Sequence, residues 1–351
     1  MVTKTKKKLS FKFKVFIALG VFLIFILAGT GFNYYLKYFG PNVTGNKEYL
    51  YIRTGSDFEA VFASIKKDEI VKDSLSFFNA AHNMDYPGKV KPGKYRLNKG
   101  MSNRSFINML KAGNQEPVKI SFQNVRLKGT LANMVSQKIE TDSASISSLL
   151  DSAAFVEKYG FNPDNVYTMF IPNSYELYWN SSAENFFIRM HEEYTKFWTP
   201  ERKNKAEKIG LTPINVSIMA SIVDAEALMD KEMPTIAGLY MNRLKKGMRL
   251  EADPTVIFAA NDFTIRRVLN KHLRINSPYN TYLNTGLPPG PISMPSIKAI
   301  DAVLNYAGHN YIYMCAKEDF SGYHNFASTL SAHLVNARKF QQALNERNIK
   351  K

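Results

Sequence analysis

The chain has 351 residues, of which 45% are hydrophobic and 13% aromatic, so it can form folded domains and is not disordered as a whole. Its 46 basic and 30 acidic residues give a formal charge of +16, and without the seven lysines of residues 1–40 the remainder still carries +9. This balance favours an anionic partner, which can be nucleic acid, a membrane surface or an anionic polymer outside the cell. The single cysteine, Cys315, excludes an intrachain disulfide and a multi-cysteine metal site, and we expect it to be a buried thiol.

An uncharged stretch at residues 15–36, VFIALGVFLIFILAGTGFNYYL, is long enough to cross a bilayer as a helix. Six lysines precede it and Lys37 alone follows closely. The positive-inside rule therefore predicts a cytoplasmic basic tail at 1–14, a transmembrane helix at 15–36 and an extracytoplasmic remainder. The alternative is a cleaved signal peptide with Ala28-Gly29-Thr30 as its small-residue site. Either topology argues against a nucleic acid as the partner.

Residues 41–117 alternate short strand-like and helical runs and predict a compact α+β module. Strands are expected at 49–53 and 93–97, and helices at 56–66, 70–84 and 102–111. Ser56 or Asp57 is the expected cap of the first helix, and Gly113 is expected to close the last one. Nothing in this module has a catalytic pattern.

After the module the sequence predicts a linker region and then, from Glu184 onward, a mainly helical domain. A strand-like run at 117–122 comes first, and an aromatic segment at 168–179 is interpreted as core in preference to a sugar-stacking surface. Helices are expected at 129–139, 185–198, 234–244, 295–306 and 328–347, and another begins at Thr212-Pro213, where a threonine cap precedes a proline.

The segment 277–296, SPYNTYLNTGLPPGPISMPS, is too rich in proline, glycine and asparagine for a regular helix or strand. Its prolines restrict the backbone, so polar groups can be held in place at little entropic cost. A binding wall for a ligand rich in hydroxyl and amide groups would have this character, and the alternative is a linker. The candidate binding side chains are Tyr279, Asn280, Thr281 and Tyr282.

One carboxylate of the helix that starts at Pro213 continues an apolar stripe. Glu226 follows Ile222 by four residues and Val223 by three, whereas Asp224 lies about 200° away around the helix axis at about 100° per residue. A carboxyl group in such a position has its ionised form desolvated, which raises its pKa and suits a general acid at neutral pH. The alternative is a surface glutamate where the stripe has simply ended.

Further polar residues accompany this helix in sequence. Arg243 or Arg249 paired with Asp253 is expected to be a structural ion pair, and Ser328 and Thr329 are expected N-caps of the last helix. His309, His324 and His333 lack the spacing of metal ligands, so no metal is expected.

Several long blocks resemble the MltG/YceG-like endolytic murein transglycosylases. These blocks are GKYRL (93–97), FIPNSYELY (170–178), ASIVDAEA (220–227), IAGLYMNRLKKGMRLEADPTVIFA (236–259), SPYNTYLNTGLPPGPISMPSIKAIDAVL (277–304) and HNFASTLSAH (324–333). The family's motif around its catalytic acid resembles SIVEKE, and here Asp224 and Ala225 depart from it while Glu226 is kept. The resemblance implies an α+β protein with a single transmembrane helix, a LysM-like module at 41–117 and a mainly α catalytic domain at 118–351 with irregular Pro/Gly-rich segments.

The resemblance implies cleavage of the β-1,4 bond between N-acetylmuramic acid (MurNAc) and N-acetylglucosamine (GlcNAc) inside peptidoglycan strands, leaving 1,6-anhydroMurNAc ends without any cofactor. Glu226 is the implied catalytic residue. The implied substrate-binding residues are Asn242, Asn280, Thr281, Tyr282, Asn325, Ser328 and Thr329, with Tyr279, Arg243, Asp253 and His333 as supporting residues. The implied location is the bacterial cytoplasmic membrane with the catalytic domain outside. Coupling to cell-wall synthases (penicillin-binding proteins) and termination of strand growth are also implied.

Two other functions remain open at this point. A membrane-anchored, non-enzymatic peptidoglycan-binding or division scaffold protein would use the small module alone, although it would need neither Glu226 nor the complete 277–296 segment. A basic nucleic-acid binder is disfavoured by the predicted topology.

Overall fold

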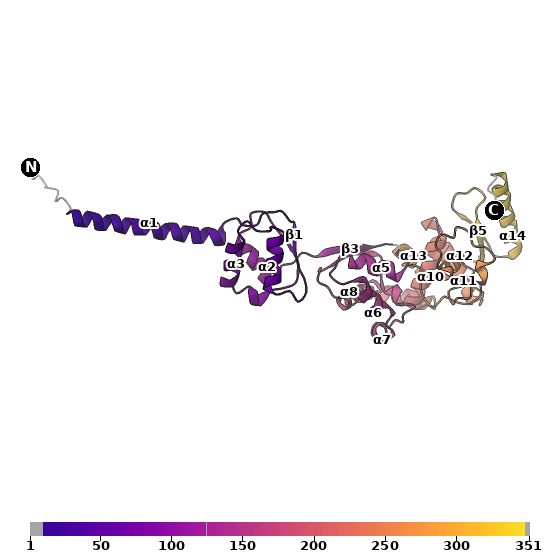
Figure 1. Cartoon of the computed structure of the whole chain (residues 1–351). Helices are drawn as coiled ribbons and strands as arrows, with labels where there is room; N and C mark the ends of the chain where they lie inside the picture. The colour runs from indigo at the N-terminus through magenta and orange to yellow at the C-terminus, as the bar shows by residue number, and fades with distance from the viewer. Residues whose placement is uncertain (1–9, 124, 348–351) are drawn as a thin grey trace, which may run out of the picture. The chain divides into compact units, whose positions relative to one another are not determined.

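The computed structural model describes residues 10–123 and 125–347, and the chain divides into two compact units (Figure 1). The first unit consists of Met1–Val118 and Tyr178–Asn180, and the second of Lys119–Leu177 and Ser181–Lys351. Most of the predicted basic tail, residues 1–9, lies outside the described residues.

Helix α1 (Phe11–Phe39) contains the predicted apolar span. It has 29 residues, a window of mean hydropathy 2.6 and no buried side chain within the chain itself, so it is long and apolar enough to cross a membrane. A helix of this length near the N-terminus fits both an anchor and a signal sequence.

The rest of the first unit is a small α+β arrangement. Strands β1 (Tyr49–Ile52) and β2 (Gly93–Arg96) pair antiparallel, and helices α2 (Phe58–Lys67), α3 (Ser74–Asn83) and α4 (Asn103–Ala112) enclose a core that includes Phe77, Tyr95 and Phe106. The expected caps are confirmed, because Asp57 accepts from the Ala60 amide and Gly113 closes α4 with φ 75°. Helix α3 starts four residues later than predicted, since residue Val71 forms a bridge with Val43.

The second unit begins with a two-stranded sheet of β3 (Val118–Phe122) and β4 (Asn173–Leu177). The same unit contains the short helices α5 (Lys128–Ser136), α6 (Ser143–Asp151) and α7 (Ala153–Val156) and the longer helix α8 (Ala183–Phe197). The prediction that segment 168–179 is core is confirmed at Phe170 and Tyr175, which are 1% and 3% exposed. Their rings lie among Phe122, Phe186 and Phe187.

Helix α10 (Pro213–Glu226) is the centre of the larger helical core. Every residue from 216 to 223 is buried, and α9 (Pro200–Lys208), α11 (Met233–Lys245), α12 (Asp253–Ala260) and α13 (Ile297–Leu304) contact it. Thr212 caps it through the Asn215 amide, as predicted. Because α10 is buried on all sides along residues 216–223, its neighbours also hold its last residue, Glu226, in place.

The C-terminal part contains an antiparallel hairpin of β5 (Tyr313–Ala316) and β6 (His324–Ala327), against which α14 (Leu330–Glu346) packs. The hairpin and helices α9 and α12 were not predicted. Helix α12 begins at Asp253, shortly after the charged residues Arg249 and Glu251, and has Pro254 in its first turn.

Candidate active site

Glu226 is the last residue of α10, and its side chain lines a cavity of about 260 Å³. The walls come from α11, from the 250–253 turn, from the 277–296 segment and from the β5–β6 hairpin. The lining residues are Glu226, Leu239, Tyr240, Arg243, Leu250, Glu251, Asp253, Tyr282, Met314, Cys315, Ala316 and His324. We call this cavity the Glu226 pocket.

The environment of Glu226 favours its protonated form. Burial raises the pKa of Glu226 from its usual 4.5 to about 7, and the negative charge of Asp253 adds to this effect. Hydrogen bonds from the Tyr240 side chain and from the backbone at Asp253 oppose it. The Tyr240 hydroxyl donates to Oε1 of Glu226 over 3.2 Å. A carboxyl group with this pKa exchanges its proton readily near neutral pH.

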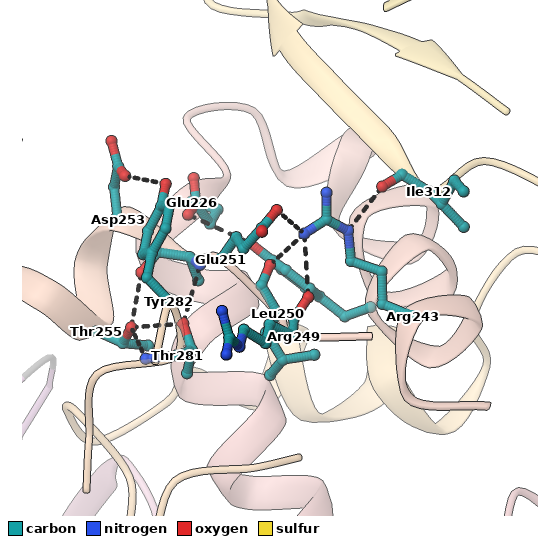
Figure 2. A network of polar contacts seen from close by, with 12 residues as sticks. Glu226, Arg243, Arg249, Leu250, Glu251, Asp253, Thr255, Thr281, Tyr282 and Ile312 are labelled. Carbon is teal, nitrogen blue, oxygen red and sulfur yellow. Dashed lines mark hydrogen bonds and ion pairs between the residues drawn. The ribbon is translucent and has the colours of Figure 1, made fainter. Parts of the chain in front are cut away.

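The pocket holds two other carboxylates, and each has a strong partner (Figure 2). The Tyr282 hydroxyl donates to Oδ1 of Asp253 over 2.7 Å, and a guanidinium nitrogen of Arg243 lies 2.9 Å from Oε2 of Glu251. Burial and the hydrogen bond to Asp253 raise the pKa of Tyr282, so the phenol remains the donor. Of the three acids, Glu226 is therefore the one suited to hold a proton.

Arg243 supports the pocket from α11, and the residue as a whole is 6% exposed. Its Nε donates to the Ile312 carbonyl over 2.7 Å, and one terminal nitrogen donates to the carbonyls of Arg249 and Leu250 over 3.1 and 2.9 Å. Figure 2 shows these bonds fanning out from the one guanidinium group. The expected pairing of Asp253 with Arg243 or Arg249 is wrong, because Arg243 pairs with Glu251.

The 277–296 segment consists of turns and bends, and it supplies Tyr282 to the pocket. Ser221 of α10 accepts from the Ile292 amide over 3.1 Å, which fastens the segment to the central helix. Near its start, Tyr279 packs its ring 4.7 Å from that of Phe258. Tyr279 thus packs on α12, and the segment forms part of the pocket wall through Tyr282.

Asn280 and Thr281 do not face the pocket in this structure, since they are 0% and 1% exposed. The Asn280 amide donates to the carbonyls of Leu273 and Ile275 over 3.0 and 2.8 Å. The Thr281 hydroxyl accepts from the Ala252 amide over 3.0 Å. Their placement as substrate contacts is corrected accordingly: these polar groups shape the loop because its own backbone needs them as partners.

Five other predicted residues lie outside the lining of the Glu226 pocket. Asn242 donates to the carbonyls of His309 and Tyr311 over 2.7 and 3.0 Å, so it ties α11 to the segment before β5. Asn325 donates to Glu318 over 2.8 Å. His333 stacks on Tyr313, with 5.2 Å between ring centroids. The remaining two precede α14: Thr329 caps it, as predicted, and Ser328 is exposed.

Sequence reasoning missed several pocket residues that come from unpredicted elements. His324 of β6 lines the pocket, and its Nδ1 and backbone amide both lie 2.9 Å from the carboxylate oxygens of Glu232, which is 7% exposed. Cys315 of β5 also lines the pocket and is half-buried, so the expectation of a buried thiol is wrong. Burial and then Glu318 raise the pKa of this thiol, so it is a poor nucleophile. Within residues 10–123 and 125–347, no three His, Cys, Asp or Glu residues are grouped as metal ligands.

Comparison with known proteins gives one family and several relatives. The model of the YceG-like family matches residues 50–339. An endolytic murein transglycosylase of Bacillus subtilis is 28% identical over 316 residues, covering 84% of this chain and 85% of the relative. One of the same name from Streptococcus pneumoniae is 26% identical over 330 residues, and the match covers 84% of this chain but 60% of that relative's length.

A solved structure has the same fold. It is a putative YceG-like protein from Listeria monocytogenes, with a TM-score of 0.54 and 23% sequence identity. The match covers 82% of this chain and 98% of the Listeria chain.

Proposed function

The chain belongs to the YceG-like family, and from that premise we propose that it is an endolytic murein transglycosylase. It cleaves the β-1,4 bond between MurNAc and GlcNAc inside peptidoglycan strands and leaves 1,6-anhydroMurNAc ends. The observation that carries this proposal is the state of Glu226: one carboxyl with a pKa of about 7, in a pocket whose other two acids are already partnered.

In the first step Glu226 acts as a general acid. Because the Tyr240 hydroxyl occupies Oε1, the proton is carried by Oε2, which gives it to the departing glycosidic oxygen. Positive charge develops at C1 of the muramoyl ring as the bond breaks. The carboxylate of Asp253 lines the same pocket, and its negative charge stabilises that developing charge.

In the second step the Glu226 carboxylate acts as a base. It removes the proton from the 6-hydroxyl of the same muramoyl residue, whose oxygen then attacks C1 and closes the anhydro ring. The nucleophile belongs to the substrate, so no second carboxylate is needed to activate water, in contrast to ordinary glycosidases. The attack is intramolecular, and proximity lowers its barrier. Glu226 ends the cycle protonated again.

We assign the substrate contacts according to exposure. Tyr282 lines the pocket and is proposed to contact the sugar, while the exposed Ser328 and the half-buried Asn325 are proposed to act farther along the strand. Asn242, Asn280, Thr281 and the Thr329 hydroxyl act as supports of the wall or as a helix cap.

We further propose a cellular arrangement. Helix α1 is a single-pass anchor in the cytoplasmic membrane, with the lysine-rich tail inside and the chain from residue 41 onward outside. Residues 41–117 form a LysM-like module that binds glycan, and the irregular Pro/Gly-rich segments of 118–351 shape the catalytic groove. The anchor keeps the enzyme beside newly made strands, where coupling to cell-wall synthases would let it terminate their elongation.

Product analysis on purified sacculi tests the chemistry. Full-length wild type in detergent is expected to give internal fragments with anhydromuramoyl ends by mass spectrometry, and Glu226→Gln is expected to give none while remaining folded by circular dichroism. Reducing ends in place of anhydro ends would identify a hydrolase. No new ends from wild type would leave the anchored binding or scaffold protein as the function.

A further inference from the structure

A second cavity, of about 290 Å³, lies next to the Glu226 pocket and shares two helices with it. The last turn of α10 supplies Glu226 to one pocket and Asp224 and Ala225 to the other, because residues two apart point about 200° away from each other. The first turns of α12 are divided in the same way, with Asp253 in one lining and Pro254 in the other. We call this second cavity the Arg126 pocket.

The walls of the Arg126 pocket combine apolar and polar surface. They consist of Pro254, Ile257, Phe258, Phe263 and Ile292, with Ser293, Asp224, Ala225 and Arg126 completing the lining. The ring of Phe258 packs against Tyr279, and its centroid lies 6.5 Å from that of Phe263. The contact with Tyr279 fixes the orientation of Phe258 in the pocket wall. The aromatic part of this lining suits methyl and methylene groups of a ligand, and its polar part suits hydrogen-bonding groups of the same ligand.

Arg126 supplies the positive charge of this pocket. Its guanidinium lies 4.6 Å from the centroid of the Phe263 ring, and it forms no ion pair with any residue the structure describes. Asp224 is the pocket's acid, and its two oxygens are occupied by the Ser296 amide and hydroxyl at 3.0 and 2.7 Å. Arg126 is therefore available to a ligand, and a carboxylate is its natural partner.

The chain beyond Phe263 adds to the positive charge. Residues 261–276 contain one acid, Asp262, whose carboxylate accepts from the Thr264 hydroxyl over 2.6 Å and from the Thr264 amide over 3.0 Å. The basic residues of the same stretch are exposed, and they are Arg266, Arg267, Lys271 and Arg274. The stretch that directly follows Phe263 in the chain is therefore basic, which favours an anionic ligand over a neutral one in its neighbourhood.

We propose that the Arg126 pocket binds the stem peptide of the muramoyl residue held at Glu226. The inference rests on the proposed function, because only a muramoyl residue carries a peptide, through its lactyl group, beside the bond that is cut. Peptide methyl groups contact Phe258 and Phe263, and a free peptide carboxylate pairs with Arg126. Binding the peptide in this pocket orients the sugar at Glu226, so strands that carry peptides are cleaved in preference to bare strands.

The test compares glycan strands with their peptides against the same strands stripped by an amidase. The measured quantity is the ratio of kcat/KM on the two substrates, for wild type, Arg126→Gln and Arg347→Gln, all as full-length protein. Arg347 is a matched control, because it also stacks on a phenylalanine, at 4.0 Å from Phe320, and lines neither pocket. We expect Arg126→Gln to lower the ratio about fivefold or more, as loss of one partly exposed charged contact would.

Two further readouts separate a charge contact from a structural one. Arg126→Lys is expected to keep part of the preference, and the wild-type ratio is expected to fall as salt is raised, since an exposed ion pair is screened. The free peptide released by the amidase is expected to inhibit the wild type more strongly than its carboxamide does.

An unchanged ratio in Arg126→Gln, or a wild type that prefers bare strands, overturns the inference while leaving the proposed function intact. An equal loss on both substrates also overturns it, because Arg126 would then contact the sugar or hold the fold. If the wild type releases anhydromuramoyl ends from neither substrate, it is the proposed function that has failed.

Discussion

The Tyr240 hydroxyl donates a hydrogen bond to Oε1 of Glu226 across 3.2 Å, from a helix that begins seven residues after the one Glu226 ends. Burial raises the pKa of both groups, so Tyr240 remains a neutral donor, and this bond together with one from the backbone at Asp253 stabilises the ionised form of Glu226. The pKa of about 7 for Glu226 is thus a balance: burial and the charge of Asp253 raise it, and these two hydrogen bonds lower it.

Tyr240→Phe removes the donor and leaves the ring in place. The ionised form of Glu226 loses this hydrogen bond, so its pKa rises above about 7. Because the first step needs the protonated acid, the alkaline fall of kcat/KM is expected to move up by about one pH unit. A pH profile of kcat/KM on sacculi measures this shift, and a profile displaced to lower pH contradicts the assignment.

Asp253→Asn is expected to move the alkaline fall of kcat/KM to lower pH. Removing the negative charge makes ionisation of Glu226 easier, so its pKa falls and the protonated fraction at neutral pH decreases. Glu251→Gln is the matched control, since that carboxylate is already neutralised by Arg243 and its side chain is 45% exposed. Equal shifts in the two variants would mean that Asp253 has no special influence on Glu226.

Arg243→Met tests how much the hydrogen bonds of Arg243 contribute to the free energy of unfolding, measured in urea. The variant leaves the Ile312 and Leu250 carbonyls without their donor in a site where the arginine side chain is 8% exposed. We expect a loss of about 3 kcal/mol in the free energy of unfolding, whereas Glu251→Gln on the exposed side of the same pair should cost less than about 1 kcal/mol. Similar losses in both variants would show that the salt bridge, and not the carbonyl contacts, carries the stability.

Periodicity alone predicted much of this architecture. The long apolar span, the capped helices of the first unit and the helix from Pro213 to Glu226 have strong local signals, and each lies within a few residues of its predicted place. The position of Glu226 on the apolar stripe favoured this acid over Asp224, because helix geometry fixes which side chains share a face, but it left a surface glutamate as the alternative. The structure places Glu226 in a pocket with a raised pKa.

The rest depends on contacts that are distant in the chain. Helix α12 has only eight residues and follows a charged turn, and strands β5 and β6 have half-buried residues without a clear alternation. Asn280 illustrates the limit for side chains: a buried amide that bonds its own loop and an amide that binds a sugar have the same sequence signal. His324 and its partner Glu232 lie 92 residues apart in the chain, so no local pattern predicts their contact.

The raised pKa of Glu226 also has a cost in folding stability. In the unfolded chain the carboxyl has its usual pKa of 4.5, and in the folded protein the pKa is about 7, so the folded state binds this proton more tightly. The stability that the protonated carboxyl contributes is present in full below about pH 4.5 and is lost as the pH rises through about 7. At higher pH the carboxyl ionises freely in the unfolded chain, whereas the pocket disfavours the ionised form in the folded protein. Glu226→Gln, which is neutral at every pH, avoids this loss.

We therefore expect Glu226→Gln to match the wild type in stability at acidic pH and to exceed it above pH 7. The difference should reach about 2 kcal/mol, less than full conversion of the pKa shift at about 1.4 kcal/mol per unit, since the side chain reaches the pocket opening. Urea unfolding at acidic and alkaline pH measures the difference, with Glu251→Gln as a control that should show no gain at alkaline pH. A constant difference between wild type and Glu226→Gln at all pH values would mean that the acid is not held protonated in the folded enzyme, and the general-acid step would lose its basis.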